Sequence, residues 1–225
     1  MELSETNYTA DSKGKIEKIK INNIPDDKLP SIIFSSNIFE RRLTDSILGA
    51  VKNNQEEGFS IYTNADEILF TPIVLGDNYS VKMHTPKDIG SDKSNTRLYF
   101  DAHIHTGSGF FSNQDLETYE EIINGNLIKI NTNMYYAVFL PHFKKIGTIY
   151  ALNEITAIVI SGIPENQIYI SIGNNGLTFN DKIILLKKSG LNVITATMEF
   201  KRNRININPL IKELTTQNFY PITNK

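Results

Sequence analysis

Short apolar segments rich in Ile, Phe, Tyr and Val alternate along this chain with amphipathic segments of helical spacing. The first kind predicts strands and the second predicts helices, so the order of elements favours an α/β fold in which a mixed sheet lies between helices. Strands are expected at 15–22, 31–39, 58–63, 67–75, 80–84, 97–105, 134–140, 147–152, 155–161, 167–172 and 192–200. Helices are expected at 42–55, 113–123, 181–189 and 209–216.

The length of 225 residues suits one medium-sized domain with a small extension. We expect an N-terminal tail and edge strand over residues 1–29 and a main domain over 30–162. A composition typical of a loop near 162–166 predicts a boundary there, followed by a small C-terminal α/β extension over 163–225.

Cysteine is absent, and this excludes disulfides, thiolate catalysis and Cys-ligated zinc. Any metal site must therefore use carboxylates and the four histidines. A formal net charge of -2 does not favour a nucleic-acid binder that relies on bulk positive charge. No apolar run is long enough to span a bilayer and the first residues are polar, so we expect a cytoplasmic protein without a membrane span.

The segment with the clearest chemical content is DAHIHTGSGFFSNQD, residues 101–115. Side chains alternate between the two faces of a strand, so His103 and His105 point the same way, about 6–7 Å apart along the chain. Asp101 shares that face. Two imidazoles in this arrangement can bind a single metal ion.

Asp115 lies ten residues after His105, at the expected start of the helix that follows a glycine-containing loop. A turn of that length can return its carboxylate to the same ion, and His103, His105, Asp115 and a water would complete a catalytic zinc site. Ser112 precedes Asp115 by three residues, which is the spacing of a helix N-cap with an acidic residue in the first turn. The two interpretations are compatible, because a cap would hold Asp115 in position.

These residues resemble the motif of the JAMM metalloproteases, also called the JAB/MPN family: a distant Glu, then HxH, a spacer, and SxxD. Here His103-Ile-His105 is followed by six residues and then Ser112-Asn-Gln-Asp115. The spacer is one residue shorter than the commonest form, and Thr106 stands where the family often has Pro. The order of elements over roughly residues 30–160 is also similar to the family's. The resemblance implies a three-layer, cytidine-deaminase-like architecture.

The resemblance also implies the roles of the site residues. In the family the distant Glu is the general base and begins the strand after the first helix, where this chain has Glu56 and Glu57. We favour Glu57, because Ser60 and Ile61 then match the small and aliphatic residues that often follow in the family; Glu56 is the alternative. Ser112 would donate a hydrogen bond to the developing oxyanion.

The function implied is zinc-dependent hydrolysis of a peptide or isopeptide bond, at a protein or peptide substrate that includes a ubiquitin-like modifier. A non-catalytic JAB/MPN-like scaffold or binding module is one alternative. Another is a metal-dependent hydrolase of the PHP or amidohydrolase type, since DAHIHT resembles the DxHxHT opening of the PHP phosphoesterases. Those barrels need a longer segment after their first strand than the one that follows His105 in this chain.

Overall fold

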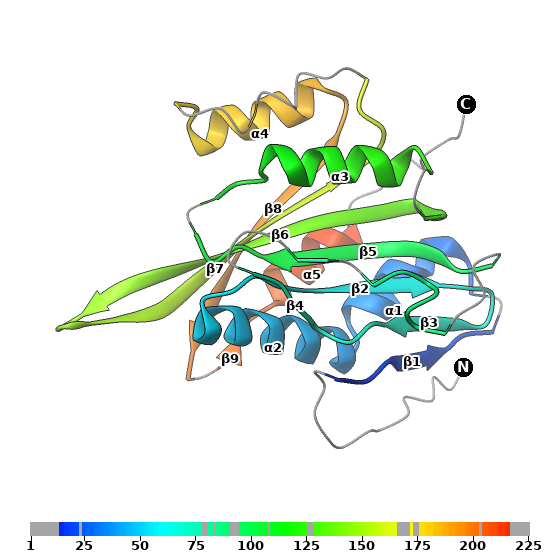
Figure 1. Ribbon diagram of the computed structural model, residues 1–225, viewed down its shortest axis with the longest axis horizontal. Helices are drawn as coiled ribbons and strands as arrows, with labels where there is room; N and C mark the ends of the chain where they lie inside the picture. Colours follow the sequence, from blue (N-terminus) through cyan, green and yellow to red (C-terminus); the bar gives the residue numbers. More distant parts are fainter. Residues whose placement is uncertain are drawn as a thin grey trace.

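A single mixed sheet forms the centre of the molecule and carries helices on both faces (Figure 1). The computed structural model describes residues 14–22, 24–77, 81–82, 84–90, 95–107, 109–125, 128–165, 172, 176–202 and 204–216. Its strands are β1 (Glu17–Lys20), β2 (Glu57–Thr63), β3 (Glu67–Phe70), β4 (Val74–Leu75), β5 (Arg97–Ile104), β6 (Ile130–Ile146), β7 (Ile149–Ser161), β8 (Asn192–Lys201) and β9 (Arg204–Ile205). Its helices are the short η2 (Asp26–Lys28), then α1 (Leu29–Phe34), α2 (Asn37–Asn53), α3 (Asn113–Ile123), α4 (Phe179–Lys188) and α5 (Asn208–Thr216).

Within the described residues the strands follow the order β1-β3-β2-β5-β6-β7-β8-β9, and β4 pairs with the other end of β2. β5 and β6 are parallel, whereas the other neighbours are antiparallel. A parallel pair needs a crossover connection, and α3 supplies it. The start of α3 is thereby brought to the end of β5, where the two histidines lie.

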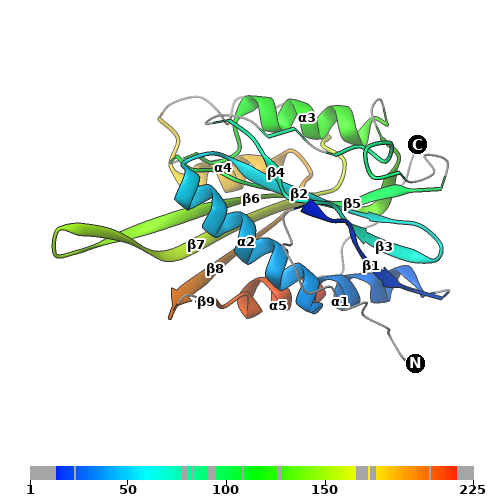
Figure 2. The same cartoon turned by 60° about the horizontal axis from the view of Figure 1, so that its bottom comes forward.

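The helices form two separate layers, as Figure 2 shows, with α1, α2 and α5 on one face of the sheet and α3 and α4 on the other. Each layer covers its own buried apolar cluster. Because both faces are covered, β2 is buried along its whole length. The predicted α/β fold with a mixed sheet between helices is confirmed.

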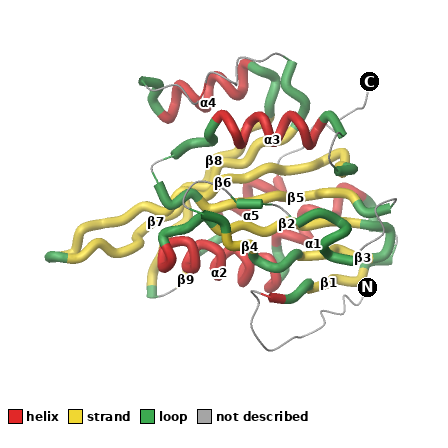
Figure 3. The backbone as a smooth tube through the Cα atoms, viewed as in Figure 1, coloured by secondary structure: helices red, strands yellow, loops and turns green. Residues whose placement is uncertain are grey.

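Most predicted elements are present with shifted ends. The helix expected at 113–123 is α3 with the same bounds, and the expected hairpin is made by β6 and β7, which are longer than predicted. In Figure 3 this hairpin extends as a two-stranded ribbon beyond the rest of the sheet. Gly147, which begins its tight turn, has a φ of 63°, a conformation that favours glycine.

The strand expected at 31–39 is wrong, since this segment forms α1 and the beginning of α2. Its apolar residues also fit helical spacing, and Ile33, Phe34 and Ile38 are buried under the sheet in that conformation. Ser36 begins α2 as its N-cap by accepting a hydrogen bond from the backbone N–H of Phe39 at 3.1 Å. Tertiary packing and this cap together override the β-propensity of the segment.

Two other expected strands lie partly outside the described residues. In 80–84 the described residues 81, 82 and 84 are loop, and the rest lie outside the described residues. Of 167–172, only Ile172 is described.

The C-terminal segment does not form a separate unit. β8 pairs with β7 over eight residue pairs in the same sheet, and Leu210 and Leu214 of α5 belong to the same buried cluster as Ile33 of α1. The expected boundary at 162–166 therefore does not divide the core.

The N-terminal strand β1 pairs with β3 at the edge of the sheet. A buried ion pair between Glu17 and Arg42 (3.0 Å) joins β1 to α2.

Among the described residues, no helix has both the length and the apolar character needed to cross a membrane.

Candidate metal centre

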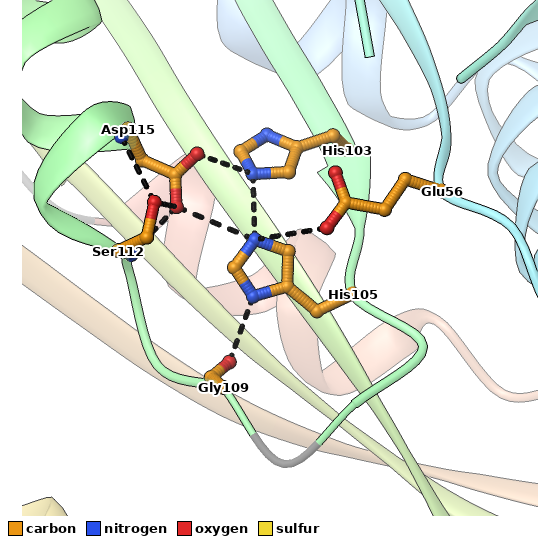
Figure 4. A network of polar contacts seen from close by, with 6 residues as sticks. All are labelled: Glu56, His103, His105, Gly109, Ser112 and Asp115. Atoms are coloured by element: carbon orange, nitrogen blue, oxygen red, sulfur yellow. Dashed lines mark hydrogen bonds and ion pairs between the residues drawn. The ribbon is translucent and has the colours of Figure 1, made fainter. Parts of the chain in front are cut away.

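Two histidines and an aspartate converge at the end of β5, on the side of the sheet that α3 covers (Figure 4). The Nε2 atoms of His103 and His105 lie 2.9 Å apart. Asp115 places Oδ1 at 3.2 Å from Nε2 of His103 and Oδ2 at 3.3 Å from Nε2 of His105. The structure therefore brings together the three residues that the sequence grouped as ligands.

These separations fit a shared cation. Ligand atoms about 2.0–2.1 Å from a tetrahedral metal ion lie about 3.3 Å from one another. The 2.9 Å between the two Nε2 atoms is close to that value, and Asp115 places a different carboxylate oxygen near each imidazole, at 3.2 and 3.3 Å. Both imidazoles are buried, so little bulk water competes for the site.

The loop after β5 orients His105. Its Nδ1 lies 2.9 Å from the carbonyl oxygen of Gly109, a distance at which Nδ1–H donates and leaves the Nε2 lone pair free for a metal. A Cβ at position 109 would lie only 3.2 Å from that Nδ1, so the close approach favours glycine. Such a contact is the usual way in which a protein sets the tautomer of a metal-binding histidine.

Ser112 caps α3 and holds Asp115. Its Oγ accepts from the backbone N–H of Asp115 at 3.1 Å, and its own N–H and Oγ–H both donate to Oδ2 of Asp115, at 2.6 and 2.8 Å. The sequence-based interpretation as a cap that positions Asp115 is confirmed. The carboxylate is thus held on one side by the start of its helix and faces the histidines on the other.

The acidic residue beside the histidines is Glu56 (Figure 4). We expected Glu57 to lie there, and the structure does not place it at the site. Oε1 of Glu56 lies 4.0 Å from Nε2 of His105. Glu56, His103 and His105 form a buried group that can hold a metal ion. Two backbone hydrogen bonds hold Glu56 against the segment after β4. Its N–H donates to the carbonyl oxygen of Asp77, and its carbonyl oxygen accepts from the N–H of Gly76.

Glu57 points to the opposite face of the sheet, under α2. Its Oε1 accepts from Nδ2 of Asn53 at 3.1 Å, and a Cβ at position 49 would overlap its carboxylate, so Gly49 makes room for it. The physical reason is strand alternation: Glu57 shares its face with Phe59 and Ile61, which belong to the core under α2. The alternation of Phe59 and Ile61 puts Glu57 on the core face of β2, and the pairing of β2 with β5 decides that the other face meets the histidines.

The environment of the site shifts three pKa values. Burial raises the pKa of Glu56, with the two histidines opposing and Asp115 adding to the rise. Burial also opposes the ionisation of Asp115, but hydrogen bonds from His103 and His105 outweigh it and hold its pKa well below the usual range. For His103, burial lowers the pKa, but the hydrogen bond to Asp115 and the nearby carboxylates raise it by more, so the net shift is upward.

Asp101 lies on the same face, two residues before His103, where it is buried and pairs directly across the sheet with Ser60. Oγ of Ser60 donates to Oδ1 of Asp101 at 2.6 Å. Burial raises the pKa of Asp101 to about 6, with the Ser60 hydrogen bond and His103 opposing.

The raised pKa of His103 leads to a prediction for metal binding. Metal ions bind the neutral imidazole, so protons compete below the pKa of His103 and the affinity falls as the pH falls. We expect titrations of the metal-free protein to show an affinity that rises by up to about tenfold per pH unit in the range below the pKa of His103 and levels off above it. An affinity that is constant over this range would contradict the placement of His103 among the ligands.

Comparisons with models of protein families, with curated proteins and with solved structures found no match to this chain.

Proposed function

We propose that this chain is a zinc-dependent peptidase or isopeptidase of the JAMM type. The observation that carries the proposal is the convergence of His103, His105 and Asp115, whose nitrogen and oxygen atoms lie 2.9–3.3 Å apart, with the buried carboxylate of Glu56 at 4.0 Å from His105. This donor set of two imidazoles and one carboxylate is typical of catalytic zinc sites, which keep a further position open. Its place at the end of β5 and the start of α3 supports the resemblance to the JAB/MPN fold.

A zinc ion at this site would supply a Lewis acid that lowers the pKa of water and polarises the scissile carbonyl. Glu56 is the group positioned to move the proton. Its distance of 4.0 Å from His105 Nε2 is longer than the separations among the three proposed ligands, so we assign Glu56 the role of the base that faces the metal-bound water and not that of a ligand. Its raised pKa suits a group that accepts a proton from water and returns it to the leaving amine.

The proposed role of Ser112 as an oxyanion donor needs a rearrangement. Its Oγ–H is engaged with Oδ2 of Asp115, so this hydroxyl would have to turn away to reach a substrate. Its role as the cap that orients Asp115 needs no such movement. We therefore propose positioning of Asp115 as its first function and oxyanion stabilisation as a second one in the substrate complex.

The proposed substrate is a polypeptide with a peptide or isopeptide bond next to a ubiquitin-like modifier. The test is elemental analysis of the purified protein, followed by cleavage assays on modifier tails linked to the lysine ε-amine, with and without a chelator. We expect about one zinc per chain and hydrolysis that stops with the chelator and returns with added zinc. Protein without metal, or hydrolysis that is indifferent to the chelator, would contradict the proposal; zinc binding without hydrolysis would favour a scaffold role.

A further inference from the structure

A cavity of about 370 Å³ adjoins the candidate metal centre. It lies between α3 and the strands β2 and β5, and His103, Asp115 and Glu56 are part of its lining at one end. On the α3 side its lining reaches Ile122, which is seven residues beyond Asp115 and therefore about 10 Å further along the helix. A substrate group next to the metal would thus have access to a sizeable compartment.

Small side chains on β2 make this space. Gly58 lies directly across from His103, and Ser60 lies directly across from Asp101. A Cβ at position 58 would come within 2.6 Å of the carbonyl oxygen of Ala102, so the close approach of the two strands favours glycine there. The lining of the cavity also includes the apolar side chains of Val74, Val81 and Ile122, which suit an aliphatic chain.

Asp101 places a carboxylate in the floor of this cavity. The residue is 8% exposed, and its hydrogen bond in the described part of the chain comes from Ser60. Among the described residues, no lysine or arginine forms an ion pair with it. A buried carboxylate gains most from a cationic partner, because the interaction is weakly screened there.

The charge of the remaining lining also favours a cation. Apart from Glu56 and the residues of the proposed metal site, the charged groups of the lining are Asp101, Glu121 and Lys82. Glu121 and Lys82 are exposed and carry opposite charges, so water and salt screen both. Asp101 is therefore the buried negative charge of the lining outside the proposed metal site and Glu56.

We propose that this cavity binds an aliphatic side chain with a cationic end, lysine or arginine, next to the scissile bond of the substrate, and that Asp101 accepts hydrogen bonds from the cation. The idea rests on the proposed peptidase function for its substrate class, while the binding itself does not depend on turnover. Asp101 lies two residues along β5 from His103, about 6–7 Å away. The bound side chain therefore belongs to a residue adjacent or nearly adjacent to the bond at the metal.

The test uses n-butylguanidinium and n-butylurea, which have similar shapes but differ in charge. Both are titrated into the full chain, and binding is followed by amide chemical shifts in NMR spectra. We expect the guanidinium to bind about tenfold more tightly than the urea or better, as a charge-assisted hydrogen bond in a buried site predicts. In Asp101→Asn the preference should fall to within about twofold.

Glu121→Gln is the matched control, because it removes the same charge from the exposed rim of the cavity. We expect this variant to keep the preference of the unmodified chain. Equal binding of the two probes by the unmodified chain would overturn the proposal without any variant. Loss of the preference in Glu121→Gln with its retention in Asp101→Asn would also overturn it. Because the readout is binding, a failed cleavage assay would reject the peptidase function and leave this result intact.

Discussion

Replacing Glu56 by Gln is expected to lower the rate of hydrolysis by about 10²–10⁴-fold while the protein still binds its metal. The amide has nearly the shape of the carboxylate but does not accept a proton at neutral pH, and Glu56 is the carboxylate that lies 4.0 Å from Nε2 of His105. The measurement is kcat at saturating substrate, together with the zinc content of the same preparation. Zinc content equal to that of the unmodified chain would assign the third ligand to Asp115.

Glu57→Gln provides the matched control, since it makes the same chemical change one residue away on the opposite face of β2. In the unmodified chain, Oε1 of Glu57 accepts a hydrogen bond from Asn53. The amide oxygen of Gln can accept the same hydrogen bond. We expect kcat and zinc content within about twofold of the unmodified chain, and any loss to appear as lower stability to unfolding. A large loss of kcat in Glu57→Gln, with full activity in Glu56→Gln, would reverse the assignment.

His105→Ala is expected to remove the metal and, with it, the hydrolytic activity. The imidazole supplies Nε2 to the cluster and is oriented by Gly109, so its loss leaves one imidazole and one carboxylate. Loss of a hydrogen-bond partner in the outer shell of a metal site already costs 10–100-fold in affinity, so loss of a ligand should cost more than about 100-fold. Zinc titration of the metal-free protein measures the change.

His142→Ala is the control for that experiment. His142 lies on β6, with Nε2 at 2.8 Å from Oγ1 of Thr156, and it is not part of the cluster. We expect unchanged zinc affinity in this variant. Equal loss of affinity in both variants would show that the effect comes from general destabilisation, and unchanged affinity in His105→Ala would place the metal elsewhere.

Local patterns in the sequence predicted several elements and part of the site. The capping pattern of Ser112 and Asp115 and the apolar spacing after it predicted α3 with its observed bounds. Strand alternation predicted that His103 and His105 share a face, and the loop length predicted the return of Asp115. These features depend on contacts between residues close together in the chain, so a short segment contains the information they need.

Other features depend on partners far away in the chain. The segment 31–39 became helical because it packs under the sheet together with α5, which begins about 170 residues later. The pairing of Gly58 with His103 and of Ser60 with Asp101 opens the cavity beside the metal centre, and no local pattern specifies that register. β8 likewise joined the central sheet, because β7 offered an edge for antiparallel pairing.

The sequence by itself therefore determined the α/β class and the group of His103, His105 and Asp115, because strand alternation and helix capping are local effects. Only the tertiary structure decided that Glu56 faces the histidines and that Glu57 faces α2. The physical reason is the pairing of β2 with β5: once Gly58 lies opposite His103, every second residue of β2 is directed to the site and the others to the core.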